Sequence, residues 1–141
     1  MTNATSTKPS SSTALVMIVD DSSAVRQQFS LALKTINFDA IGFEDAETAL
    51  SHVGLIDHGI SAAILDYRLP GIDGISLARK LRAHDNWNDT PILMCSTTTD
   101  QATLRKAKSA GVNGWAVKPF QPRPFLKTLF TLISEHQTKR S

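Results

Sequence analysis

The sequence predicts an α/β protein built on a parallel sheet that helices cover on both faces. Short apolar runs alternate with longer segments of helical period, which is the order that a parallel sheet with crossover helices requires. Most of these runs are apolar throughout rather than alternating, as expected for strands that are buried on both sides. The chain has 141 residues, 41% of them hydrophobic. That is enough for one domain with a sizeable core.

Five strands and five helices are expected, in strict alternation. The predicted strands are 14–19, 40–43, 62–65, 91–95 and 114–117. Each segment between or after them repeats apolar residues at helical spacing, and most of these segments begin at a serine or aspartate that is typical of an N-cap. The predicted helices are 22–36, 45–53, 73–84, 100–111 and 123–137. No internal repeat accompanies this alternation.

Composition narrows the class of protein. The 15 basic and 13 acidic residues leave a net charge of +2, which does not indicate binding to nucleic acid or insertion into a membrane. A single cysteine, Cys95, excludes an internal disulfide framework and fits the reducing cytoplasm. Residues 1–13 are rich in Ser and Thr and are expected to be a disordered tail. The domain is then expected over 14–136, followed by a short polar tail over 137–141.

Polar residues stand where four of the predicted strands end. The first run stops at Asp20-Asp21, the third at Asp66, the fourth at Ser96 and the fifth at Lys118. Each residue alone is a common turn former, helix cap or solvated charge. In open parallel sheets, however, ligands bind beyond the carboxyl ends of the strands. The joint occurrence therefore predicts one pocket that holds three carboxylates, a hydroxyl and an ammonium group.

Such a pocket suits phosphoryl transfer. Carboxylates that lie close together repel one another unless a cation sits among them. Oxygen ligands in an open, solvated site favour Mg²⁺, or Mn²⁺ in its place. The cation would keep Asp66 ionised and nucleophilic, so that Asp66 could form an aspartyl phosphate. Lys118 would supply a further positive charge and Ser96 a hydroxyl donor.

The motifs "MIVDDS", "ILDYRLPGIDG", "PILMCS" and "GWAVKPF" resemble those of the receiver domains of two-component response regulators. They occur in family order, and the resemblance covers about residues 14 to 136. It implies a doubly wound, flavodoxin-like or CheY-like fold with strand order 2-1-3-4-5 and five helices. It also implies that the Lys118-Pro119 peptide bond is cis.

The resemblance assigns a role to each matching residue. Asp66 corresponds to the phosphoacceptor, Asp21 and Asp66 to direct Mg²⁺ ligands, and Asp20 to a ligand through water. The backbone carbonyl of Arg68 would be the remaining protein ligand. Ser96 and Lys118 would both contact the phosphoryl group.

Four positions raise questions about switching and phosphate lifetime. Trp115 stands at the switch aromatic, which acts with Ser96 and is more often Tyr, Phe or His. Thr97 stands beside the phosphoryl site where the family favours Ala or Gly, and it is expected to restrict access to that site. Arg68, two residues after the phosphoacceptor, and Thr98 are expected to tune the attack of water on the aspartyl phosphate.

The expected function is that of a stand-alone cytoplasmic receiver, a switch rather than a turnover enzyme. Its phosphoryl donor would be a sensor histidine kinase or a histidine phosphotransferase. Its downstream protein target would bind the face formed by the fourth helix, fifth strand and fifth helix, roughly residues 100 to 136. A phosphorelay shuttle or phosphate sink is an alternative role. A flavodoxin-like FMN protein and a phosphatase with an aspartate nucleophile are remote ones, since Asp20-Asp21 disfavours FMN and the chain has no cap domain.

Overall fold

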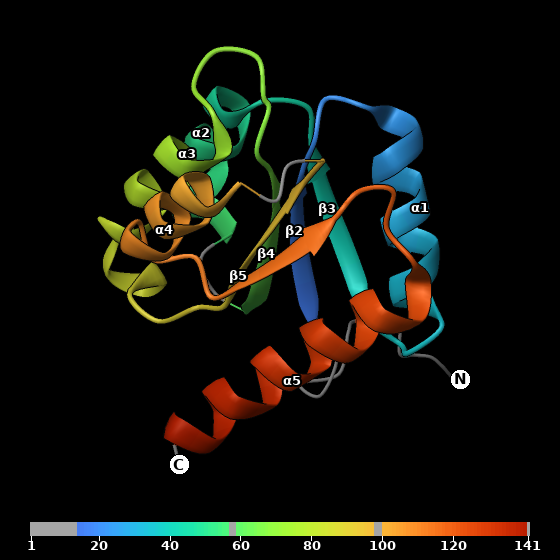
Figure 1. The fold of residues 1–141 in the computed structure, drawn as a ribbon. Helices are drawn as coiled ribbons and strands as arrows, with labels where there is room; N and C mark the ends of the chain where they lie inside the picture. The colour runs from blue at the N-terminus through green and yellow to red at the C-terminus, as the bar shows by residue number, and fades with distance from the viewer. Residues whose placement is uncertain (1–13, 57–58, 98–99, 141) are drawn as a thin grey trace.

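A single parallel sheet forms the centre of the computed structural model, which describes residues 14–56, 59–97 and 100–140 (Figure 1). The strand order is β3-β2-β4-β5-β6, and every neighbouring pair is parallel. Because β2 is the first strand along the chain and β6 is the fifth, this is the predicted order 2-1-3-4-5. The expected tail over 1–13 lies outside the described residues. The strands are β2 (Leu15–Val19), β3 (Asp39–Phe43), β4 (Ile60–Asp66), β5 (Ile92–Ser96) and β6 (Gly114–Val117).

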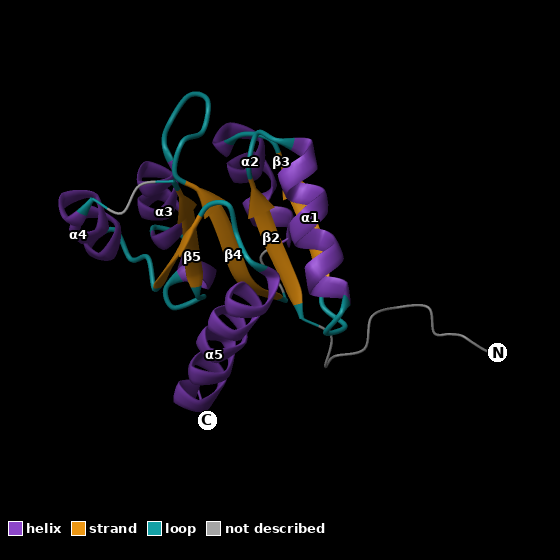
Figure 2. Cartoon of the chain, turned by 45° about the vertical axis from the view of Figure 1, so that its right-hand side comes forward, coloured by secondary structure: helices purple, strands orange, loops and turns teal. Residues whose placement is uncertain are grey.

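Helices cover both faces of the sheet. Helices α1 and α5 lie on one side, and α2, α3 and α4 lie on the other (Figures 1 and 2). A short 3₁₀ helix, η1, follows α3 and was not predicted. The helices are α1 (Ser23–Lys34), α2 (Ala46–Ile56), α3 (Gly74–Arg82), η1 (Asp85–Trp87), α4 (Gln101–Ser109) and α5 (Pro122–Arg140). No helix in the described ranges is long and apolar enough to cross a membrane.

The core explains why the strands are apolar throughout. Met17 and Val19 of β2 pack with residues of α2, α3 and α4, whereas Val16 and Ile18 pack with residues of α1 and α5. Successive side chains of a strand point to opposite faces. Since helices cover both faces of the sheet, the side chains on both faces of the central strands are buried. This is why these strands are apolar throughout.

The last helix extends beyond its predicted end. The sequence predicts this helix over 123–137, and α5 continues through 138–140, within the expected polar tail, and ends at Arg140. At its other end, α5 begins at Pro122 and has Pro124 in its first turn, where a missing N–H costs little.

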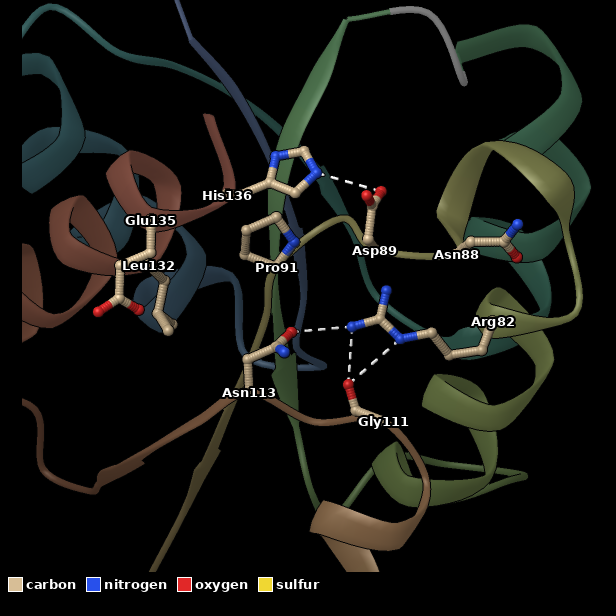
Figure 3. Close-up of a pocket in the computed structure, with 9 residues that line it drawn as sticks. All are labelled: Arg82, Asn88, Asp89, Pro91, Gly111, Asn113, Leu132, Glu135 and His136. Carbon is tan, nitrogen blue, oxygen red and sulfur yellow. Dashed lines mark hydrogen bonds and ion pairs between the residues drawn. The ribbon is translucent and has the colours of Figure 1, made fainter. Parts of the chain in front are cut away.

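Arg82, the last residue of α3, binds several chain segments near the amino-terminal ends of β5 and β6 (Figure 3). Its Nη1 donates to the carbonyls of Trp87 and Thr90, at 2.6 and 2.7 Å. Its Nε and Nη2 donate to the carbonyl of Gly111, and Nη2 also donates to Oδ1 of Asn113. All five N–H groups of the guanidinium are therefore used, and α3, η1 and the loops before β5 and β6 are joined.

Gly111 is adapted to this contact. Its φ of 101° is a conformation that favours glycine, and a Cβ there would lie 2.7 Å from Nε of Arg82. The guanidinium is half-buried, and burial lowers the pKa of Arg82, although Asp89 opposes this effect. The group nevertheless stays charged, so the carbonyl dipoles replace the water that it has lost.

Replacing Arg82 should destabilise the whole fold. We expect Arg82→Met to lower the free energy of unfolding by about 2 to 4 kcal/mol, because hydrogen bonds to a charged group are lost and buried carbonyls are left unpaired. Arg82→Lys should recover part of the loss, since an ammonium has only three donors. Urea unfolding measures both. Arg79→Met, an exposed arginine of the same helix, is the matched control, and equal stability of the two Met variants would contradict the prediction.

Candidate functional site

The ends of four strands meet at one edge of the sheet, as the sequence predicts. Asp20 directly follows β2, Asp66 and Ser96 are the last residues of β4 and β5, and Lys118 follows β6. The register aligns these ends, because Asp66 pairs with Cys95 and Ser96 pairs with Val117. Three of the side chains are buried there, with exposed fractions of 1% for Asp20, 6% for Asp66 and 2% for Ser96.

The three predicted carboxylates are close enough to share a cation. Asp20, Asp21 and Asp66 each offer an oxygen within 4.8 Å of the others. Asp20 and Asp66 are buried, whereas Asp21 is exposed. A set of oxygen donors with one side open to solvent fits Mg²⁺ or Mn²⁺, which keep part of their water. The residues present therefore fit the cation that the sequence predicts.

Lys118 lies between the two buried carboxylates. Its Nζ is 2.9 Å from Oδ2 of Asp20 and 3.1 Å from Oδ1 of Asp66. Burial acts to lower the pKa of Lys118, but hydrogen bonds and charge attraction from Asp20 and Asp66 outweigh it, so that the pKa is raised. The ammonium is therefore charged at neutral pH and crosslinks β2 to β4.

One ammonium does not fully compensate Asp66. Burial raises the pKa of the Asp66 carboxyl, and the neighbouring charge of Asp20 raises it further. Lys118 and the backbone N–H of Arg68 lower that pKa, but by less. Without a metal ion, ionised Asp66 is thus held at a cost in stability, which is the electrostatic reason for a cation to bind here.

The loop after β4 leaves the pocket sharply. Tyr67 N donates to the carbonyl of Cys95 at 2.9 Å, and Gly74 N donates to the carbonyl of Tyr67 at 2.8 Å. Arg68 is exposed, and its guanidinium carbon lies 5.8 Å from the centre of the Tyr67 ring. Its side chain therefore lies at the rim of the site, in contact with solvent.

The residues predicted to switch or tune the site occupy different environments. Trp115 is half-buried and packs against the core on the α2–α4 side. Thr97 is exposed, and Thr98 lies outside the described residues. The Lys118-Pro119 bond is cis, as predicted, and Lys118 N donates to the carbonyl of Ser96 at 2.8 Å.

Comparison with known proteins identifies the family. A family model described as the response regulator receiver domain matches residues 16–130. The chain belongs to the response regulator receiver family. It is similar to a CheY homolog, a chemotaxis protein of Campylobacter jejuni, with 32% identity over 110 residues that cover 77% of this chain and 83% of that protein. It also resembles the solved chemotaxis response regulator CheY4 of Vibrio cholerae, with a TM-score of 0.80, 31% identity and coverage of 86% and 99%.

A longer relative shares the receiver as one part of its chain. The phosphate regulon transcriptional regulatory protein PhoB of Pseudomonas aeruginosa is 29% identical over 118 residues, which cover 84% of this chain and 51% of PhoB. The chain thus spans about half the length of this relative. What the two proteins share is the CheY-like receiver fold of two-component signalling.

The raised pKa of Asp66 gives a prediction for the stability of the metal-free protein. Because the folded state raises the pKa of Asp66, ionised Asp66 lowers stability above its folded pKa, and this penalty disappears below its unfolded pKa. In EDTA at pH 7, Asp66→Asn should therefore unfold at higher urea than wild type, and the difference should shrink toward pH 3. Asp39→Asn, an exposed aspartate of β3, is the control. An Asp66→Asn variant less stable than wild type at pH 7 would contradict the prediction.

Proposed function

We propose that the protein accepts a phosphoryl group onto Asp66 from a phosphohistidine of a sensor histidine kinase or histidine phosphotransferase. A carboxylate oxygen of Asp66 forms the new bond to phosphorus as the phosphorus–nitrogen bond of the donor breaks, and the released imidazole takes up a proton. The observation that carries this proposal is the position of the Asp66 carboxylate, 3.1 Å from Nζ of Lys118 and within 4.8 Å of Asp20 and Asp21.

Each neighbouring residue has a part in this step. Asp20, Asp21, Asp66 and the backbone carbonyl of Arg68 would hold Mg²⁺ or Mn²⁺, which neutralises charge between the carboxylates and the incoming phosphoryl oxygens. Lys118, already placed beside Asp66, would pair with a phosphoryl oxygen. Ser96 would donate its hydroxyl to another. Phosphoryl transfer needs little more than such positioning and charge stabilisation.

The aspartyl phosphate would then act as a switch. Ser96 and Trp115 would couple the pocket to the face formed by α4, β6 and α5, where a downstream protein target binds in one of two states. A location in the cytoplasm, beside the donor kinase, is part of this proposal. The transfer is a single self-catalysed event on the protein itself, so we describe a switch rather than an enzyme.

Acetyl phosphate tests the central step. With Mg²⁺, wild type should gain the mass of one phosphoryl group, and Asp66→Asn should gain none, because the nucleophile is removed. Asp73→Asn is the matched control, since Asp73 lies in the same loop and its Oδ1 caps α3 by accepting from Ser76 N, which asparagine can also do. Intact-mass measurement with and without EDTA reads the result. An unmodified wild type would overturn the proposal.

Arg68 and Thr98 are expected to set how long the phosphate lasts. Arg68 lies at the exposed rim of the pocket, so its removal should admit water and shorten the lifetime of the aspartyl phosphate several-fold. Decay of the phosphorylated mass after removal of acetyl phosphate measures this for Arg68→Ala and Thr98→Ala. Arg79→Ala, on the exposed face of α3, should decay like wild type. Unchanged lifetimes in both test variants would remove the tuning role.

A regulator and a phosphorelay shuttle differ in where the phosphate goes. A shuttle would return the group rapidly to a histidine domain, whereas a regulator would bind its target only when phosphorylated. Following labelled phosphate from the phosphorylated protein to an added histidine phosphotransferase domain distinguishes the two roles.

A further inference from the structure

Arg26 of α1 contacts the main chain beside the carboxylate pocket. The helix begins at Ser23 after the N-cap Ser22, whose hydroxyl accepts from Val25 N. The guanidinium of Arg26, three residues into the helix, turns back toward the sheet, and Nη1 donates to the carbonyl oxygen of Asp20. A donor that carries a full charge makes this one of the stronger kinds of hydrogen bond. The contact ties α1 to the residue that directly follows β2.

The neighbouring strand leaves room for this arginine. Gly42 lies within β3, and a Cβ there would lie 3.1 Å from Cδ and 3.5 Å from Nε of Arg26. The φ of Gly42 is not in the positive region, so space rather than backbone conformation favours a glycine. A glycine inside a strand weakens it and often marks a close approach by another group. Here that group is the stem of Arg26, which crosses the edge strand on its way to Asp20.

The carbonyl that Arg26 holds belongs to the peptide unit between Asp20 and Asp21. Because a peptide unit is planar, fixing its carbonyl oxygen also restricts how the next residue is directed. Asp20 is held elsewhere too: its N donates to the carbonyl of Phe43 at 3.1 Å, and its Oδ1 accepts from Ser22 N at 2.9 Å. Asp21 is exposed, so the direction of its carboxylate depends mainly on this main-chain geometry.

We propose that Arg26 is a positioning residue for the cation site. By holding the carbonyl of Asp20, it directs the carboxylates of Asp20 and Asp21 toward the same cation, and Gly42 is the space that this requires. The inference rests on the proposed metal-dependent function and deepens it. It gives a role to a residue that contacts neither the cation nor the phosphoryl group, and that the sequence motifs alone do not single out.

Binding of Mn²⁺ alone tests the proposal. Titration followed by the electron paramagnetic resonance signal of free Mn²⁺, with Mg²⁺ as competitor, gives the dissociation constant without phosphorylation. Arg26→Met should weaken binding about tenfold, the size of effect typical when a partner of a metal ligand is lost. Arg26→Lys should bind more tightly than Arg26→Met because it keeps a charged donor. Lys34→Met, which removes one exposed positive charge from the same helix, should bind like wild type.

Gly42→Val separates positioning from general stability. Valine is favoured in strands, so this variant should unfold at the same or higher urea than wild type. Its side chain should nevertheless displace Arg26, at a cost in stability that the strand preference of valine offsets, and weaken Mn²⁺ binding several-fold. In an Arg26→Ala background, Gly42→Val should cause no further loss, because the contact that it disturbs is already gone. This variant also provides the test if Arg26→Met does not fold.

The outcomes are distinct. Weaker Mn²⁺ binding in Arg26→Met and Gly42→Val, with a coupling between the two positions, supports the inference. Wild-type affinity in both variants overturns it while leaving Asp66 phosphorylation intact. A wild type that neither binds Mn²⁺ nor reacts with acetyl phosphate overturns the proposed function and this inference together.

Discussion

The repulsion between two buried carboxylates is the constraint on which the site depends. Asp20 and Asp66 end adjacent strands of a parallel sheet, so the fold itself brings them to the same edge. The ammonium of Lys118 offsets part of this repulsion, since its Nζ lies 2.9 Å from Oδ2 of Asp20 and 3.1 Å from Oδ1 of Asp66. Burial, and after it the charge of Asp20, still raise the pKa of Asp66, so the compensation by Lys118 is partial. A cation bound at this edge of the sheet would therefore stabilise the fold.

The two ends of the sheet handle buried charge in opposite ways. At the far end, the guanidinium of Arg82 is surrounded by carbonyl groups and an amide oxygen that take up all of its donors. Because its donors are all used within the protein, this guanidinium does not require a ligand. It holds together α3, η1 and the loops before β5 and β6. At the carboxyl edge, charges of the same sign are gathered with too few counter-charges. The first arrangement favours rigidity, and the second favours binding and chemistry.

The sequence predicts those features that depend on residue type at regular spacing. Strand order follows from the family motifs, and Asp20, Asp66 and Lys118 converge because parallel strands end at one edge. The roles of Arg26 and Arg82 could not be predicted in this way, because nearly all of their partners are main-chain carbonyls, which no residue type marks. For Arg26 one signal was present: a glycine, Gly42, inside a predicted strand. The extension of α5 through 138–140 was missed because those polar residues carry no apolar period.

Charge balance also explains why cation binding and phosphorylation should be linked. When ionised, the carboxylates of Asp20, Asp21 and Asp66 together with Lys118 leave two negative charges, the number that a divalent cation neutralises. Without the cation, the pocket would repel a phosphoryl group, which is itself an anion. With it, under the proposed function, the phosphoryl group would compete with Asp20 and Asp66 for Lys118. Under the proposed function, the ammonium that crosslinks β2 to β4 would therefore be the first protein group to respond to the added charge.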